Sequence, residues 1–195
     1  MGLLALHEER ITKNQQRTGN CPSLHRNYLQ MPKFTALVYA RKEDALYLDR
    51  ALESLKVAND RLLINADVDP EIKRIARRHH ARQKFGIPGV TPGAYEMDGY
   101  HHWILVLRPS EALSNDLIRS LEQWKKGKKD ESRGYAFALL RQNGTRWLAE
   151  DPELRLVNRH LINWIGELPE NQSAPVLPGP LLQYETDVRE QRIAS

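Results

Sequence analysis

Three short polar segments carry side chains that could bind an anionic ligand, and each directly follows an apolar run. The segments are 40–44, 65–69 and 108–111. If the apolar runs are parallel strands, their carboxyl ends lie at one edge of a sheet, where ligands of open α/β folds bind. A guanidinium such as that of Arg108 is permanently charged and can hold a phosphate group through two donors. The pattern therefore predicts the place of a binding site without naming a reaction.

The elements that must position these segments alternate between strand and helix. Short apolar and β-branched runs predict strands over 34–39, 61–65 and 103–107. Helical spacing predicts a helix over about 44–57, and Asp69 and Pro70 resemble the N-cap and first residue of a second helix. Further expected elements are a long loop over 84–100, a helix around 117–124, and strands over 135–141, 154–157 and 181–184. This order predicts an α/β fold, a Rossmann-type open and mostly parallel sheet with helices on both faces.

Six stretches then occur in the order and near the spacing of one known family. They are Ala36-Leu-Val-Tyr-Ala-Arg-Lys-Glu-Asp44, Leu52-Glu-Ser-Leu55 with Leu62-Leu-Ile-Asn65, Trp103-Ile-Leu-Val-Leu-Arg-Pro-Ser-Glu111, Leu154-Arg-Leu-Val-Asn-Arg159 and Leu177-Pro-Gly-Pro-Leu-Leu182. Together they resemble the family-2 glycosyltransferases, which have the GT-A fold. The resemblance covers about Phe34 to Tyr184. It implies transfer of a sugar from a nucleotide-sugar donor to a glycan acceptor, a reaction of the hexosyltransferase type.

The sequence departs from the family where the family binds its metal. The third strand of the family ends in Asp-x-Asp, which binds a divalent cation and through it the donor diphosphate; here Arg108 and Ser110 stand at those positions, and only Glu111 is kept. The second-strand Asp of the family is Asn65, and a later His is Gln183. We therefore expect no metal and no other cofactor. The expected donor-binding residues are Arg41, Glu43, Asn65, Asp67, Arg108, Ser110 and Glu111.

Two functional interpretations follow from these replacements. In one, Arg108 supplies directly the positive charge that a metal would supply, and transfer is metal-independent. In the other, the domain is a catalytically inactive module that binds a nucleotide, a glycan or a protein partner. If catalysis persists, an inverting displacement needs a general base. The resemblance places Glu170 at the His-Glu position of the family, with Glu167 as a close substitute; both could instead be solvated loop residues.

Composition and charge limit the other function classes. The net charge of +4 includes +3 from residues 1–33, so the rest of the chain is nearly neutral and nucleic-acid binding is not favoured. No apolar run is long enough to span a membrane, and a single cysteine, Cys21, fits a reducing, cytoplasmic location. We expect a loose N-terminal arm over 1–32 that could be a start-site artefact with Met31 as the true start, one domain over 33–188, and a polar tail over 189–195.

Two adjacent histidine pairs are the remaining metal-like feature. His79-His80 and His101-His102 could suggest zinc, but adjacent side chains point apart on helices and on strands, so at most one of each pair could join a site. No cysteine or carboxylate stands beside them at the usual zinc spacing. His79 lies on the apolar face of its predicted helix, which favours a packed histidine.

Overall fold

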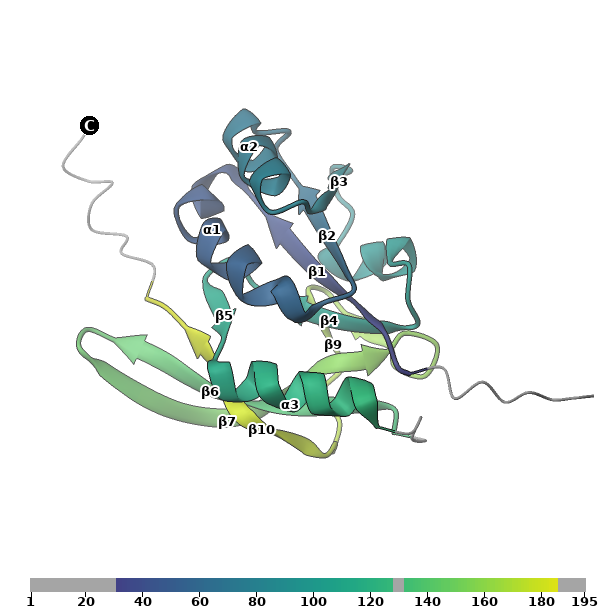
Figure 1. The fold of residues 1–195 in the computed structure, drawn as a ribbon. Helices are drawn as coiled ribbons and strands as arrows, with labels where there is room; N and C mark the ends of the chain where they lie inside the picture. Colours follow the sequence, from purple (N-terminus) through teal and green to yellow (C-terminus); the bar gives the residue numbers. More distant parts are fainter. Residues whose placement is uncertain (1–30, 128–131, 186–195) are drawn as a thin grey trace, which may run out of the picture.

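The computed structural model describes residues 31–127 and 132–185 (Figure 1). The expected arm, apart from residues 31 and 32, and the expected tail lie outside the described residues. The strands are β1 (Phe34–Ala40), β2 (Asp60–Asn65), β3 (Arg82–Phe85), β4 (Trp103–Leu107), β5 (Glu111–Leu113), β6 (Gly134–Asn143), β7 (Arg146–Asn158), β8 (Trp164–Ile165), β9 (Leu168–Pro169) and β10 (Val176–Gln183). The helices are η1 (Lys42–Asp44), α1 (Ala45–Ser54), η2 (Leu55–Val57), α2 (Pro70–Arg78), η3 (Pro92–Asp98) and α3 (Asn115–Lys126), where η marks a 3₁₀ helix.

Eight strands form one open mixed sheet in the order β3-β2-β1-β4-β7-β6-β10-β5, and β8 and β9 form a small separate hairpin. The half built from β3, β2, β1 and β4 is parallel, as the alternation of strand and helix predicts. In the other half β7 runs antiparallel to β4 and β6, while β10 is parallel to β6 and antiparallel to β5. The α/β class and the open, mostly parallel sheet are therefore confirmed, and the carboxyl ends of β1 and β4 lie side by side.

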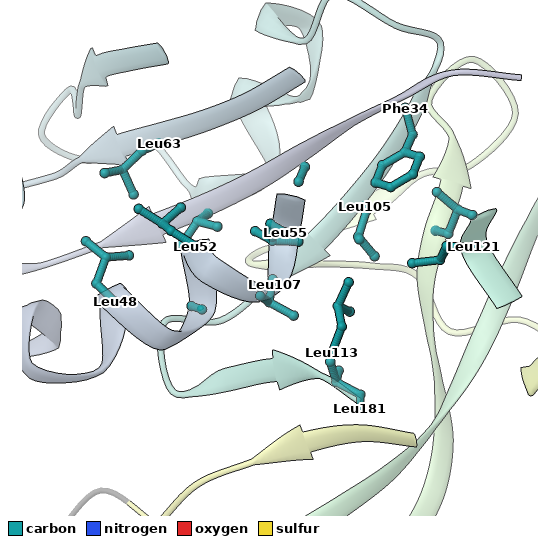
Figure 2. Packing of buried hydrophobic residues seen from close by; sticks show 14 of the residues in the cluster. Phe34, Leu48, Leu52, Leu55, Leu63, Leu105, Leu107, Leu113, Leu121 and Leu181 are labelled. Atoms are coloured by element: carbon teal, nitrogen blue, oxygen red, sulfur yellow. The ribbon is translucent and has the colours of Figure 1, made fainter. Parts of the chain in front are cut away.

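Two apolar clusters cover the two faces of the sheet unequally. The three α-helices lie on one side (Figure 1) and share one cluster with β1 and β4, in which Phe34, Leu52, Leu105 and Leu121 are buried (Figure 2). The opposite face is covered by η3 and the segment after β7, where Tyr95 and other side chains close a smaller cluster. Within the described residues, no helix is long and apolar enough to cross a membrane.

The structure confirms the sequence signals that depend on short-range chemistry. The side chain of Asp69 accepts hydrogen bonds from the backbone N–H groups of Glu71 (2.8 Å) and Ile72 (3.1 Å), so it caps α2, and Pro70 is the first helical residue. His79 is buried at the C-terminus of α2, with Nε2 2.8 Å from Oδ1 of Asp49. This hydrogen bond lowers the pKa of the Asp49 carboxyl group.

Several strands differ from the expected pattern. The loop expected over 84–100 contains the end of β3 and the helix η3. The strand β3 is an edge strand of three polar or charged residues followed by Phe85, so it lacks the apolar run of a buried strand. The strands β6 and β7 extend beyond the body as a long hairpin (Figure 1) whose outer residues are mostly exposed, and this exposure explains why only 154–157 of β7 was predicted.

Candidate functional site

A pocket of about 240 Å³ lies where β1 and β4 end, at the edge of the sheet that the sequence indicates. Leu37 pairs with Val106 in the parallel ladder between these strands, and both contribute to the apolar lining of the pocket together with Tyr39. Its polar lining is Arg41, Glu43, Asp44, Arg108, Ser110 and Glu167. Distant chain segments thus bring two arginines, which can bind an anion, and three acidic residues to the lining of one cavity.

The turn after β1 is held by two carboxylates. The side chain of Asp44 accepts a hydrogen bond from the backbone N–H of Arg41 at 2.7 Å, and Asp67 accepts one from the N–H of Lys42 at 2.8 Å. Burial raises the pKa of Asp44, although the hydrogen bond from Arg41 partly offsets this effect. Asp67 does not line the pocket; it connects the turn after β1 to the turn after β2.

The turn after β4 is held by Glu111. The carboxylate of Glu111 accepts a hydrogen bond from the backbone N–H of Arg108 at 2.8 Å, and its own N–H donates to the carbonyl of Arg108 at 3.0 Å. Glu111 is 1% exposed and receives both terminal nitrogens of the fully buried Arg155, at 2.7 and 3.0 Å. The sequence predicts that Glu111 binds the donor. In the structure, Glu111 does not line the pocket but supports the backbone of Arg108.

Asn65 also lies beneath the site. It is fully buried at the end of β2, its amide nitrogen donates to the carbonyl of Asp69 (2.8 Å), and its Oδ1 accepts from the N–H of Asp69 (2.9 Å). Both hydrogen-bonding ends of this amide are therefore engaged within the turn that leads to α2. Gln183, at the position of the later His in the family, pairs with Glu111 in the ladder between β10 and β5.

The hairpin of β8 and β9 carries Glu167 to the pocket. Gly166 and Glu167 form its two-residue turn, in which Gly166 has a φ of 65° that favours glycine. The carbonyl of Gly166 accepts a hydrogen bond from the N–H of Gly93 on η3 at 3.0 Å, which anchors the turn. Glu170, just after β9, is half-buried, does not line the pocket, and donates its backbone N–H to Asn163 at 2.9 Å.

The residues at the metal positions of the family do not fit a divalent cation. Arg108 is cationic, Ser110 is a neutral hydroxyl, and the carboxylate of Glu111 is already bound to Arg155 and to the backbone of Arg108. Hard divalent cations require several free oxygen ligands, carboxylates above all. Across residues 31–127 and 132–185, no three His, Cys, Asp or Glu side chains are grouped so that they could hold a metal ion.

A second pocket, of about 520 Å³, lies beside η3 and includes Glu96 and Arg159. Oε2 of Glu96 is buried and has no hydrogen-bond partner among the described residues. Burial raises the pKa of Glu96 to about 7, and the charge of Arg159 counteracts only part of this effect. The native state therefore favours the protonated form of this carboxyl group.

Glu96→Gln should make the protein less sensitive to alkaline pH. Because the pKa of Glu96 in the native state exceeds its ordinary value of 4.5, the stability that this group contributes is complete below the ordinary pKa and is lost as the pH rises through about 7. We expect the variant to melt a few degrees above the wild type near pH 8 and at nearly the same temperature near pH 5. Circular-dichroism melts across this range measure the difference; parallel curves for the two proteins would contradict the expectation.

Sequence comparisons name no family, and structure comparisons find distant likenesses. No family model matches the chain, and no curated protein matches it. The chain is similar to the crystal structure of TarS 1-349 from S. aureus, with 13% identity and a TM-score of 0.38 over 56% of this chain and 35% of that one, so it spans about a third of that structure. It is also similar to a crystal structure of 4-diphosphocytidyl-2C-methyl-D-erythritol synthase, with 14% identity and a TM-score of 0.46 over 67% and 77% of the two chains. By its own strand order, the chain has an α/β fold with one open, mostly parallel eight-stranded sheet.

Proposed function

We propose that the pocket at the ends of β1 and β4 binds the diphosphate of a nucleotide-sugar donor without a metal, and that the protein transfers the sugar to a glycan acceptor. The observation that supports this proposal is the presence of Arg41 and Arg108 in one pocket. Two guanidinium groups can neutralise and orient a diphosphate by charge-assisted hydrogen bonds. In the family that the sequence resembles, a cation performs this task.

Arg108 is the better placed of the two arginines for this role. Its side chain is 36% exposed, so the guanidinium can reach a ligand, and its nearest carboxylate oxygen, on Glu111, is 3.7 Å away, too long for a hydrogen bond. The backbone of Arg108 is fixed by two hydrogen bonds with Glu111. A fixed backbone beneath a guanidinium that has no hydrogen bond to a carboxylate among the described residues is suited to ligand binding, because little has to rearrange when a phosphate arrives.

Glu167 is the candidate base for the acceptor hydroxyl. It is exposed at the tip of the β8–β9 hairpin and lines the pocket together with Arg108, whereas Glu170 does not line it. A general base must lie within hydrogen-bond reach of the proton that it removes. The place of Glu167 in the pocket lining supports this role for an acceptor that enters over the hairpin.

Arg108→Ala should weaken the binding of UDP or GDP roughly 10- to 100-fold, the range expected for hydrogen bonds between charged groups. Calorimetric titration of the full chain with each nucleotide, with and without Mn²⁺, measures this effect. Arg74→Ala is the matched control, because Arg74 is an exposed arginine on α2 that pairs with Glu71 away from the pocket. Binding that requires Mn²⁺, or that Arg108→Ala leaves unchanged, would overturn the metal-free site.

The inactive-module alternative gives a different result in a second assay. Both interpretations allow nucleotide binding, but only an active transferase releases UDP or GDP from a nucleotide sugar, either to an acceptor or slowly to water. Metal-independent binding without any such release would favour a module that binds a nucleotide. If the protein binds a glycan or another protein but no nucleotide, the result would favour an inactive module that has lost its donor site.

A further inference from the structure

Two histidines that are far apart in the sequence meet at the opposite end of β4 from the pocket. His102 directly precedes β4 and His160 follows β7. Nδ1 of His102 lies 2.9 Å from Nε2 of His160, and the ring centroids are 4.9 Å apart. Both residues are exposed to solvent. The partner of His102 is therefore not its neighbour in the sequence, His101, but the distant His160, which the fold brings close to it.

The backbone holds the two imidazoles in place. The N–H of Arg159 donates to the carbonyl of His102 at 3.0 Å, and the N–H of His160 donates to Oδ1 of Asn158 at 3.2 Å. Asn158 in turn pairs with Trp103 in the ladder between β4 and β7. The segment before β4 and the segment after β7 are thus joined to each other on the strand side of the histidine pair.

We propose that His102 and His160 form a surface chelate for Cu²⁺ or Ni²⁺. With metal–nitrogen bonds of about 2.0–2.1 Å, two ligands at right angles lie about 2.9 Å apart, whereas tetrahedral ligands lie about 3.3 Å apart. The observed 2.9 Å fits the right-angle geometry, and square-planar or tetragonal nitrogen and oxygen sites are typical of Cu²⁺ and Ni²⁺. Since no three metal-binding side chains are grouped in the described parts of the chain, water completes the coordination.

This site is separate from the proposed donor site. The histidines lie beside a hollow that includes Lys33 and Trp103, at the start of β4, whereas the donor pocket lies where β1 and β4 end. A metal at the histidine pair therefore cannot substitute for the missing donor-site cation. Its expected effect is structural, because a ligand that binds only the folded protein raises the apparent stability of the fold.

Calorimetric titration of the full chain with CuSO₄ or NiCl₂ at fixed neutral pH tests the chelate. His102→Asn and His160→Asn should each weaken the tightest binding phase by about 100-fold, because the second imidazole of a chelate binds at high effective concentration. His80→Asn is the matched control, since His80 is exposed, lies elsewhere on the surface and has a φ of 51° that asparagine tolerates. Any background from other histidines is common to the control and the wild type.

A second measurement guards against an effect on folding. Ni²⁺ should raise the melting temperature of the wild type and of His80→Asn, but not that of either chelate variant. Metal binding that survives both chelate substitutions, or that falls equally in the His80 control, would overturn the site. If the wild type binds metal no more tightly than the two chelate variants do, the 2.9 Å contact is only a hydrogen bond between two imidazoles.

Discussion

Glu111→Ala should lower the free energy of unfolding by about 3–5 kcal/mol, the cost of leaving a buried charge without its partner. Arg155 is fully buried, and both of its terminal nitrogens contact the Glu111 carboxylate, at 2.7 and 3.0 Å. Without this carboxylate, the guanidinium keeps Glu153 as its one remaining acidic partner within residues 31–127 and 132–185, and the backbone N–H of Arg108 loses its acceptor. Urea unfolding followed by circular dichroism measures the loss.

Two further variants separate the charge pair from general damage. Glu153→Ala should cost much less, because the side chain of Glu153 is one-third exposed and Glu111 remains to balance Arg155. The double variant Glu111→Leu with Arg155→Met should recover much of the lost stability, since replacing both ions by apolar groups removes the unbalanced charge. A double variant as unstable as Glu111→Ala would show that the cost comes from the shape of the turn rather than from the charge.

This role of Glu111 changes how variants of the site must be interpreted. Loss of nucleotide binding in a Glu111 variant would not show that Glu111 contacts the ligand, because the same change releases the turn that carries Arg108. The partly exposed side chain of Arg108 can be shortened while both hydrogen bonds between Glu111 and Arg155 are kept. Arg108→Ala is therefore the variant that tests the proposed site directly.

The sequence predicts the parts of the fold whose signals are local. The strands β1, β2 and β4 are apolar because both faces of the sheet are covered there, and α2 carries its own N-cap at Asp69. The short strands β3, β5, β8 and β9 have two to four residues each. Such short strands are stabilised by pairing with distant partners, so their own residues carry no periodic signal.

The candidate site was predictable in place but not in detail. The rule that ligands bind beyond the carboxyl ends of parallel strands correctly brings the turns after β1 and β4 into one pocket. It cannot tell which polar side chains face the cavity, because Asn65 and Glu111 are turned inward by partners elsewhere in the fold. One signal was available: Arg155 stands between Leu154 and Leu156, and a charge inside a buried strand requires a buried partner.

Gly179→Ala should be among the most damaging single substitutions in the chain, with a loss above about 4 kcal/mol or failure to fold. Gly179 has a φ of 97°, where a side chain is strained, and a Cβ there would lie 2.3 Å from the backbone nitrogen of Leu117 and 2.7 Å from the carbonyl carbon of Asp116. Both atoms belong to the first turn of α3, so neither can move aside without displacing the helix. Gly179 lies where the register of β10 against β6 shifts, between Leu177 and Pro180.

Gly144→Ala is the matched control, because Gly144 also has a positive φ, of 59°, but nothing lies within 4 Å of the position of its Cβ. Strain alone should cost this variant only about 1–2 kcal/mol. The difference between the two variants in urea unfolding, or in soluble yield if Gly179→Ala does not fold, therefore measures the packing of β10 against α3. Equal losses of stability in the two variants would mean that α3 can move away from the added methyl group. The close contact with α3 would then not explain why glycine stands at position 179.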